Sequence, residues 1–105
     1  MRWYNNLYVG QEAAKHRYSI IHAIRKKKPR LGTYVITTPT DNKGIVEIIH
    51  NAILVQDCYQ SSDVMIIGIA QGRCEAYELV RDIVDAMYKK NGDFDINAFC
   101  HINGA

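Results

Sequence analysis

The pattern of apolar and charged residues predicts a helix over residues 73–90. Its polar face carries opposite charges four residues apart, Arg81 with Asp85 and Asp85 with Lys89, a spacing that stabilises helices. Asn91-Gly92 follows, as a helix C-terminus favours. The apolar residues recur at helical spacing along the other face; they are Ala76, Leu79, Val80, Ile83, Val84 and Met87.

Two further helices are expected. One covers Gln11 to Lys28 and ends before Pro29, because proline disfavours a helical conformation in the residue before it. The other covers Lys43 to Val55, with Thr40, Asp41 or Asn42 as its N-cap. The Ile and Val content of this second segment is also typical of a strand.

Three strands complete the pattern. Thr33–Thr38 is β-branched and aromatic, as strands are. Val64–Ala70 is apolar on both faces, which is typical of a strand covered on both sides in a parallel sheet. Asn6–Val9 is shorter and ends at Gly10.

The order of these elements predicts a small two-layer or three-layer β-α-β-α-β-α domain of the α/β class. Alternating strands and helices favour parallel pairing through right-handed crossovers, so we expect a mostly parallel three-stranded sheet with Val64–Ala70 in its centre. An antiparallel edge strand would change which loops meet. Because the edges of so small a sheet need covering, we also expect a homodimer.

Composition bounds the class of protein. The chain has 105 residues, 48% of them hydrophobic and 23% charged, which fits a single domain over residues 1–105 and excludes a low-complexity or disordered chain. The longest apolar run, Val64–Ala70, is too short to cross a bilayer, and residues 1–6 lack the apolar core of a secretory signal. We therefore expect a cytoplasmic protein with no membrane partner, and a flexible tail at residues 100–105.

The net charge of +2 conceals an uneven distribution. Residues 1–40 hold eight Lys or Arg and one acid, a net charge of +7, whereas residues 41–105 carry −5. The basic half either pairs with the acidic half, in one chain or in a dimer, or contacts an anionic partner such as nucleic acid. Cations at a helix end also complement the helix dipole. The candidate contact residues are Lys15, Arg17, Arg25, Lys26, Lys27, Lys28 and Arg30, with only Tyr18 and Tyr34 as nearby aromatic residues.

A second candidate site follows from the expected sheet. Ligands of parallel α/β sheets bind beyond the carboxyl ends of the strands, where three loops would converge. Neither a dinucleotide nor a P-loop fingerprint occurs, and the same residue types also serve as ordinary turns and caps. The candidate rim residues are Gln11, Thr38, Thr40, Asp41, Asn42, Gln71, Gly72 and Arg73.

No motif indicates catalysis, a metal or a cofactor. His16 and His22 are six residues apart, so one helix face cannot bring both to a metal ion. The three cysteines form no CxxC pair, which excludes a zinc ribbon or a thioredoxin motif. We therefore expect no catalytic residue, no metal ligand and no cofactor.

The order of motifs resembles a family of small proteins of unknown function from gut-type anaerobic bacteria, often encoded near mobile or conjugative elements. The resemblance covers residues 3–99 and rests on Leu7-Tyr8-Val9-Gly10, the basic helix, Tyr34-Val35-Ile36-Thr37, Ile67-Gly68-Ile69-Ala70-Gln71-Gly72, Glu75-Ala76-Tyr77-Glu78-Leu79-Val80 and Gly92-Asp93-Phe94-Asp95-Ile96. It implies a bacterial cytosolic α/β protein and no particular activity.

Two functions stay open at this point. The first is a non-enzymatic, homo-oligomeric accessory protein whose basic helix end binds nucleic acid or an acidic protein surface. The second is a protein that binds a nucleotide, a phosphate or another small ligand at the rim loops, with or without catalysis.

Overall fold

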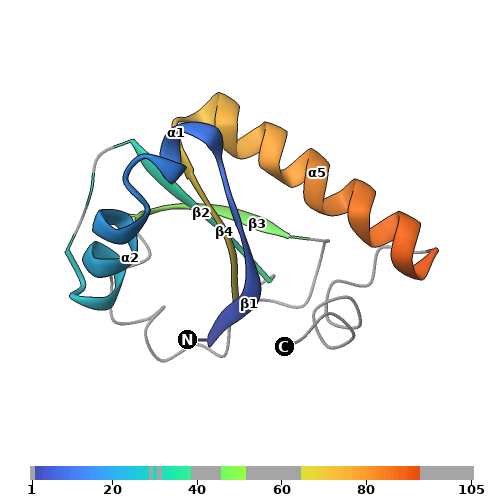
Figure 1. The fold of residues 1–105 in the computed structure, drawn as a ribbon, viewed down its shortest axis with the longest axis horizontal. Helices are drawn as coiled ribbons and strands as arrows, with labels where there is room; N and C mark the ends of the chain where they lie inside the picture. The colour runs from blue at the N-terminus through green and yellow to red at the C-terminus, as the bar shows by residue number, and fades with distance from the viewer. Residues whose placement is uncertain (1, 29, 31, 39–45, 52–64, 93–105) are drawn as a thin grey trace.

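The computed structural model of the protein describes residues 2–28, 30, 32–38, 46–51 and 65–92. These residues form a mixed sheet with helices on both faces, which confirms the predicted α/β class (Figure 1). The strands are β1 (Arg2–Val9), β2 (Thr33–Thr37), β3 (Glu47–His50) and β4 (Met65–Gln71). The helices are α1 (Gln11–Ala14), α2 (Arg17–Arg25) and α5 (Arg73–Asn91).

The strand order is β1-β4-β2-β3, so β4 lies between β1 and β2 as its two-sided apolarity predicts. The strand directions differ from the expected ones. β1 and β4 are parallel, but β2 is antiparallel to both β4 and β3. The predicted mostly parallel three-stranded sheet is therefore wrong, and the described sheet has four strands in a mixed arrangement.

The predicted helix over residues 43–55 is also wrong, because Glu47–His50 is a strand paired with β2. Ile49 faces Val35 across the pair and is buried on the side of α2, whereas the neighbouring Ile48 packs on the side of α5. Two adjacent isoleucines thus cover opposite faces of the sheet, as the strand period of two requires. Residues 43–45 and 52–55 of the predicted helix lie outside the described part of the chain.

The first predicted helix is divided into α1 and α2. His16 has φ −126° and ψ 24°, outside the helical region, so the ladder of hydrogen bonds is interrupted there. The helix also ends at Arg25 instead of Lys28, because Lys27 has a left-handed conformation with φ 57°. α5 matches its predicted helix to within one residue.

Two hydrophobic clusters hold the layers together, one on each face of the sheet. On one face, α5 covers β4 and β2, with Leu79, Ile83 and Met87 buried against Ile36 and Ile67. The other cluster lies under α1 and α2, where Ala13, Ile20 and Ile24 contact Val35, Ile49, Ile66 and Ile69. The loss of apolar exposure on both faces of the central strand is the main source of stability in a domain of this size.

The pairing of β4 with β2 contains a shift in register. β4 pairs Gly68 with Ile36 and Ile66 with Thr37, so Ile67 is extra in the register. Both Ile67 and Gly68 consequently lie toward α5: Ile67 belongs to the cluster under α5, and a Cβ on Gly68 would lie 2.9 Å from the Leu79 Cδ2. This geometry is that of a β-bulge.

Candidate functional site

The carboxyl ends of the parallel strands β1 and β4 meet, and one acidic side chain fills the space between them. The Glu75 carboxylate accepts hydrogen bonds from three backbone N–H groups. Its Oε1 accepts from Glu12, and its Oε2 accepts from Gln71 at 2.6 Å and from Ala13 at 3.3 Å. Glu12 and Ala13 belong to the first turn of α1, whose N-cap residue supplies no side-chain hydrogen bond. Glu75 from α5 therefore caps α1 in place of a local side chain.

Gly10 makes this arrangement possible. A Cβ at this position would overlap the Glu75 side chain, with the Oε2 only 2.7 Å away. The Gly10 backbone has φ −63° and ψ 160°, which any residue can adopt. The requirement for glycine is thus the close approach of Glu75 and not the backbone conformation.

The candidate rim residues separate in the structure. Gln11, Gln71, Gly72 and Arg73 lie at the end of the sheet where β1 and β4 finish. Thr38 lies at the opposite end, where its Oγ1 accepts a hydrogen bond from the Met65 N–H at the start of β4. The other candidates, Thr40, Asp41 and Asn42, lie outside the described residues.

The expected convergence of three loops is therefore wrong. Its physical reason is the direction of β2, which runs antiparallel to β4 and so begins where β1 and β4 end. Thr33 at the start of β2 donates from its Oγ1 to the Gln71 Oε1 at 2.9 Å, and the Gly72 N–H donates to the Gly32 carbonyl at 2.7 Å. At the end of the sheet where β1 and β4 finish, Gln71 and Gly72 are therefore hydrogen-bonded to the start of β2, and Glu75 is hydrogen-bonded to the N-terminus of α1.

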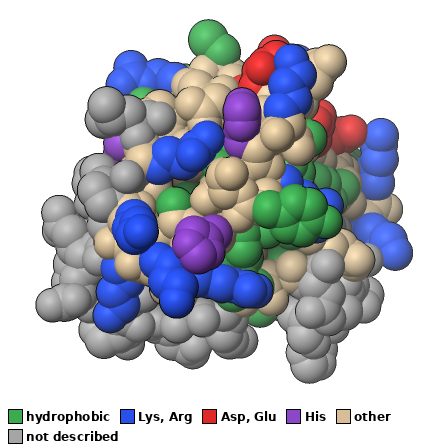
Figure 2. Space-filling model, turned by 60° about the vertical axis from the view of Figure 1, so that its left-hand side comes forward, with side chains coloured by type: hydrophobic (Ala, Val, Ile, Leu, Met, Phe, Trp, Pro, Cys, Tyr) green, Lys and Arg blue, Asp and Glu red, His purple; other side chains and the backbone are tan. Residues whose placement is uncertain are grey.

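The predicted basic residues, in contrast, lie on the surface of the protein. Lys and Arg side chains spread over the side of the molecule that carries α2, with histidines among them (Figure 2). We define the basic surface by its exposed residues, which are Lys15, His16, Arg17, His22, Arg25, Lys26, Lys27 and Lys28. Arg30 is half-buried, and its Nε is buried with no hydrogen-bond partner, so it stands apart from this surface.

Among the described residues, one carboxylate forms an ion pair with the basic surface. Lys15 pairs with Glu12, with 3.2 Å between the Nζ and the Oε1. Among the residues that the structure describes, no ion pair joins Arg17, Arg25 or Lys26–Lys28 to an acid. Their positive charges are therefore not neutralised by the described acidic half of the chain.

The chain leaves α2 through a Schellman motif that contains a lysine where glycine is usual. The Lys28 N–H donates to the Ala23 carbonyl at 2.8 Å, and the Lys27 N–H donates to the Ile24 carbonyl at 3.2 Å. Lys27 takes the left-handed position of this motif, which costs a residue with a Cβ about 1–2 kcal/mol. Asn51, at the end of β3, donates from its Nδ2 to the Lys28 carbonyl at 3.2 Å and ties the segment to the sheet.

Two aromatic side chains border the basic surface. The Arg25 guanidinium lies over the Trp3 ring, 5.7 Å from its centroid, within the range of a cation–π interaction. Tyr18 projects from α2 with 84% of its surface exposed. Tyr34, the other aromatic residue near the basic segment in the sequence, is half-buried and packs edge-on against His50.

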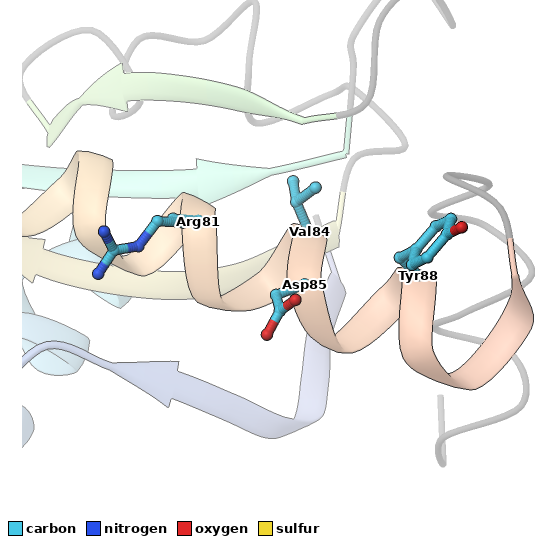
Figure 3. A pocket seen from close by; sticks show the side chains of 4 residues that line it. All are labelled: Arg81, Val84, Asp85 and Tyr88. Atoms are coloured by element: carbon cyan, nitrogen blue, oxygen red, sulfur yellow. The ribbon is translucent and has the colours of Figure 1, made fainter.

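A separate hollow of about 320 Å³ lies along α5 (Figure 3). Arg81, Val84, Asp85 and Tyr88, from successive turns of the helix, line it. Asp85 pairs with Lys89, with 3.0 Å between Oδ2 and Nζ, which confirms one of the two predicted helix pairs. The Arg81 side chain points away from Asp85 in Figure 3, and the two form no ion pair within the described structure.

Sequence reasoning missed two residues of these sites. Glu75 and Trp3 act through partners far away in the chain, so no local pattern marks them. Tyr18 is named in the sequence only as an aromatic residue near the basic segment, and its position opposite Ile20 and Ile24 on the same helix accounts for its exposure.

The described residues form neither a metal site nor a disulfide. No three His, Cys, Asp or Glu side chains gather there as metal ligands, and Cys74 is an exposed thiol outside any disulfide. Of the helices that the structure describes, none has the length and apolarity to span a bilayer.

Comparison with family models, with curated proteins and with solved structures finds no match to this chain. The resemblance to the mobile-element family accordingly stays a prediction.

Proposed function

We propose that the basic surface binds nucleic acid by contacting its phosphates, and that the protein is a non-enzymatic accessory protein. The observation that carries the proposal is the set of exposed cations along α2 with no described carboxylate to pair with, apart from Glu12 beside Lys15. Clustered cations of one sign attract a polyanion and release its counterions on binding.

Local stability does not account for two of these cations. Arg17 begins α2 and no acid is present in the first turn, although the helix dipole favours negative charge there. Lys27 holds a left-handed conformation that glycine would adopt without strain. Positions that break a local rule without a local gain are frequent at functional sites. Both residues gain a role if they face phosphates.

The spacing of the charges favours a nucleic acid over an acidic protein surface. Cations stand at both ends of α2, whose nine residues span about 14 Å. A nucleic acid places a phosphate every few ångströms along its length, so one nucleic-acid strand can contact the cations at both ends of α2. An acidic protein would need carboxylates spread over the same distance.

Binding of labelled oligonucleotides, measured by fluorescence anisotropy across a salt series, tests the proposal. About four phosphate contacts would give a slope of log K against log salt of roughly −3 on a single strand and nearly −4 on a duplex. Lys27→Gly, which suits the left-handed backbone, and Lys26→Gln should each weaken binding and make the slope shallower by about one. Lys90→Gln, an exposed lysine on α5, is the matched control and should change neither value.

Two results would overturn the proposal. One is no binding of either oligonucleotide at low salt. The other is binding of poly-glutamate as tight as that of nucleic acid, with the same sensitivity to Lys27→Gly, which would assign the basic surface to an acidic protein.

The proposal includes a homodimer. Its support is that β1 and β3 are the outer strands of the described sheet, and open edges invite pairing. Light scattering coupled to gel filtration tests it, and a monomer mass at micromolar concentration would contradict it.

A further inference from the structure

The side chain with the least evident role in the fold is Tyr18. It is 84% exposed, more than the other exposed tyrosines that the structure describes, Tyr77 and Tyr88, at 60% and 56%. Within the described structure it makes no hydrogen bond and no ring contact. On the helix it points away from Ile20 and Ile24, which are buried under α2. The fold therefore does not explain an aromatic ring at this position.

The neighbours of Tyr18 on the outer side of α2 are a histidine and an arginine. His22 and Arg25 follow at four and seven residues, so all three share the outer side of α2. The Arg25 guanidinium is held over the Trp3 ring. An aromatic ring and a positioned guanidinium thus stand about 10 Å apart along the helix, with Lys26–Lys28 beyond them.

A ring and a guanidinium offer flat faces to a flat ligand. Proteins bind unpaired bases by stacking them on aromatic rings or on arginine planes, while nearby cations contact the phosphates. A duplex keeps its bases stacked inside, so on a duplex Tyr18 would meet only the sugar-phosphate backbone. An exposed ring beside an arginine and several lysines therefore favours a single-stranded nucleic acid, whose bases are accessible, over a duplex.

We infer that the basic surface binds single-stranded nucleic acid, with a base stacked on Tyr18 and the adjoining phosphates on the cations of α2 and Lys26–Lys28. This inference rests on the proposed function and specifies its substrate class. Base stacking is sequence-tolerant because every base has a flat face, so the surface does not select a sequence.

The test compares oligonucleotides of about 16 nucleotides, a length within the site sizes of single-strand-binding domains. The probes are fluorescein-labelled oligo-deoxythymidine, oligo-uridine and a DNA duplex of equal length. The variants are Tyr18→Ala, Tyr18→Phe and, as the matched control, Tyr77→Ala on α5. Both positions, 18 and 77, are exposed, so the circular dichroism and melting temperature of the three variants should match those of the unmodified protein.

Stacking on one base is worth about 1–3 kcal/mol, which corresponds to a loss of roughly 5- to 150-fold in affinity. Tyr18→Ala should lose this much on at least one single-stranded probe, with an unchanged salt slope because no charge is removed. Tyr18→Phe should keep most of the affinity, and Tyr77→Ala all of it.

Failure of this inference differs from failure of the proposed function. If Lys27→Gly weakens binding but Tyr18→Ala does not, phosphate contact stands and stacking is refuted. Tighter binding of the duplex, with Tyr18→Ala weakening duplex and single strand equally, also refutes the inference. Absence of binding to all three probes refutes both.

Discussion

Replacement of Glu75 by alanine tests the contact that joins α5 to the start of α1. The carboxylate accepts from the N–H groups of Glu12, Ala13 and Gln71, and these groups come from two separate elements. An alanine leaves all three without this acceptor. Water can replace it at the exposed Glu12 contact but less readily at the other two, which are partly buried.

The cost follows from these three contacts. Loss of an N-cap acceptor costs about 0.5–2 kcal/mol, and an unsatisfied, partly buried N–H about 1 kcal/mol or more. We expect Glu75→Ala to lower the free energy of unfolding by about 2–3 kcal/mol. In a domain of this size that corresponds to a fall of roughly 10–20 °C in melting temperature.

Gly10→Ala should have almost the same effect, since a Cβ there displaces the Glu75 side chain. In the Glu75→Ala background the obstacle is gone. Because the Gly10 backbone suits alanine, the second change should then be neutral, or should stabilise by about 0.4–1 kcal/mol through the unfolded chain. The two effects are therefore strongly non-additive.

Urea denaturation followed by the fluorescence of Trp3, the one tryptophan in the chain, measures the full double-mutant cycle. We expect a coupling of about 2–3 kcal/mol between positions 10 and 75, where independent sites add to within about 0.5 kcal/mol. Additive effects would refute the reasoning, because they would mean that Gly10 and Glu75 act separately.

Two further changes test other parts of the fold. Lys27→Gly should raise the melting temperature by about 2–8 °C, because relief of the left-handed strain at φ 57° exceeds by about 0.5–1 kcal/mol the extra chain entropy that glycine loses on folding; a lower melting temperature would show that the lysine side chain stabilises the Schellman motif. Gly68→Ala should destabilise by about 1–3 kcal/mol, since its Cβ would lie 2.9 Å from the Leu79 Cδ2 and 3.2 Å from the Tyr8 carbonyl oxygen. An unchanged urea midpoint for that variant would mean that α5 can move away from β4 at little cost.

Periodicity predicts the elements that show one face to the core. The aliphatic residues of α5 recur at helical spacing along one side, and the bounds of the helix follow from the sequence to within one residue. β3 has no such one-sided pattern. The adjacent residues Ile48 and Ile49 are compatible with a helix or with a strand in the sequence. The pairing of this segment with β2 makes it a strand.

Strand direction is the property that the apolar pattern does not encode. A strand with two buried faces has the same side-chain pattern whichever way it runs, so β4 is recognised as central while the direction of β2 is not. The expected convergence of the three rim loops depended on that direction and is wrong for this reason. The basic surface depended only on exposure and charge along α2, which a helical pattern does encode.

The same comparison explains why the proposed phosphate-binding surface lies apart from the place where ligands of an α/β sheet usually bind. At the ends of β1 and β4, the N–H groups of Glu12 and Ala13 already bind a carboxylate of the chain itself. A phosphate placed there would have to displace Glu75. The cations of the basic surface have no such internal partner in the described structure, apart from Lys15.

This difference predicts how free nucleotides compete with a polymer. A mononucleotide can contact one or two cations of a surface that extends about 14 Å along α2, whereas the proposed nucleic-acid strand would contact the whole set. ATP at the same phosphate concentration as a bound oligonucleotide should therefore displace almost none of it in the anisotropy assay. If ATP displaces the strand stoichiometrically, and Glu75→Ala makes it do so more strongly, then the phosphates bind at the ends of β1 and β4 and the basic surface is not the site.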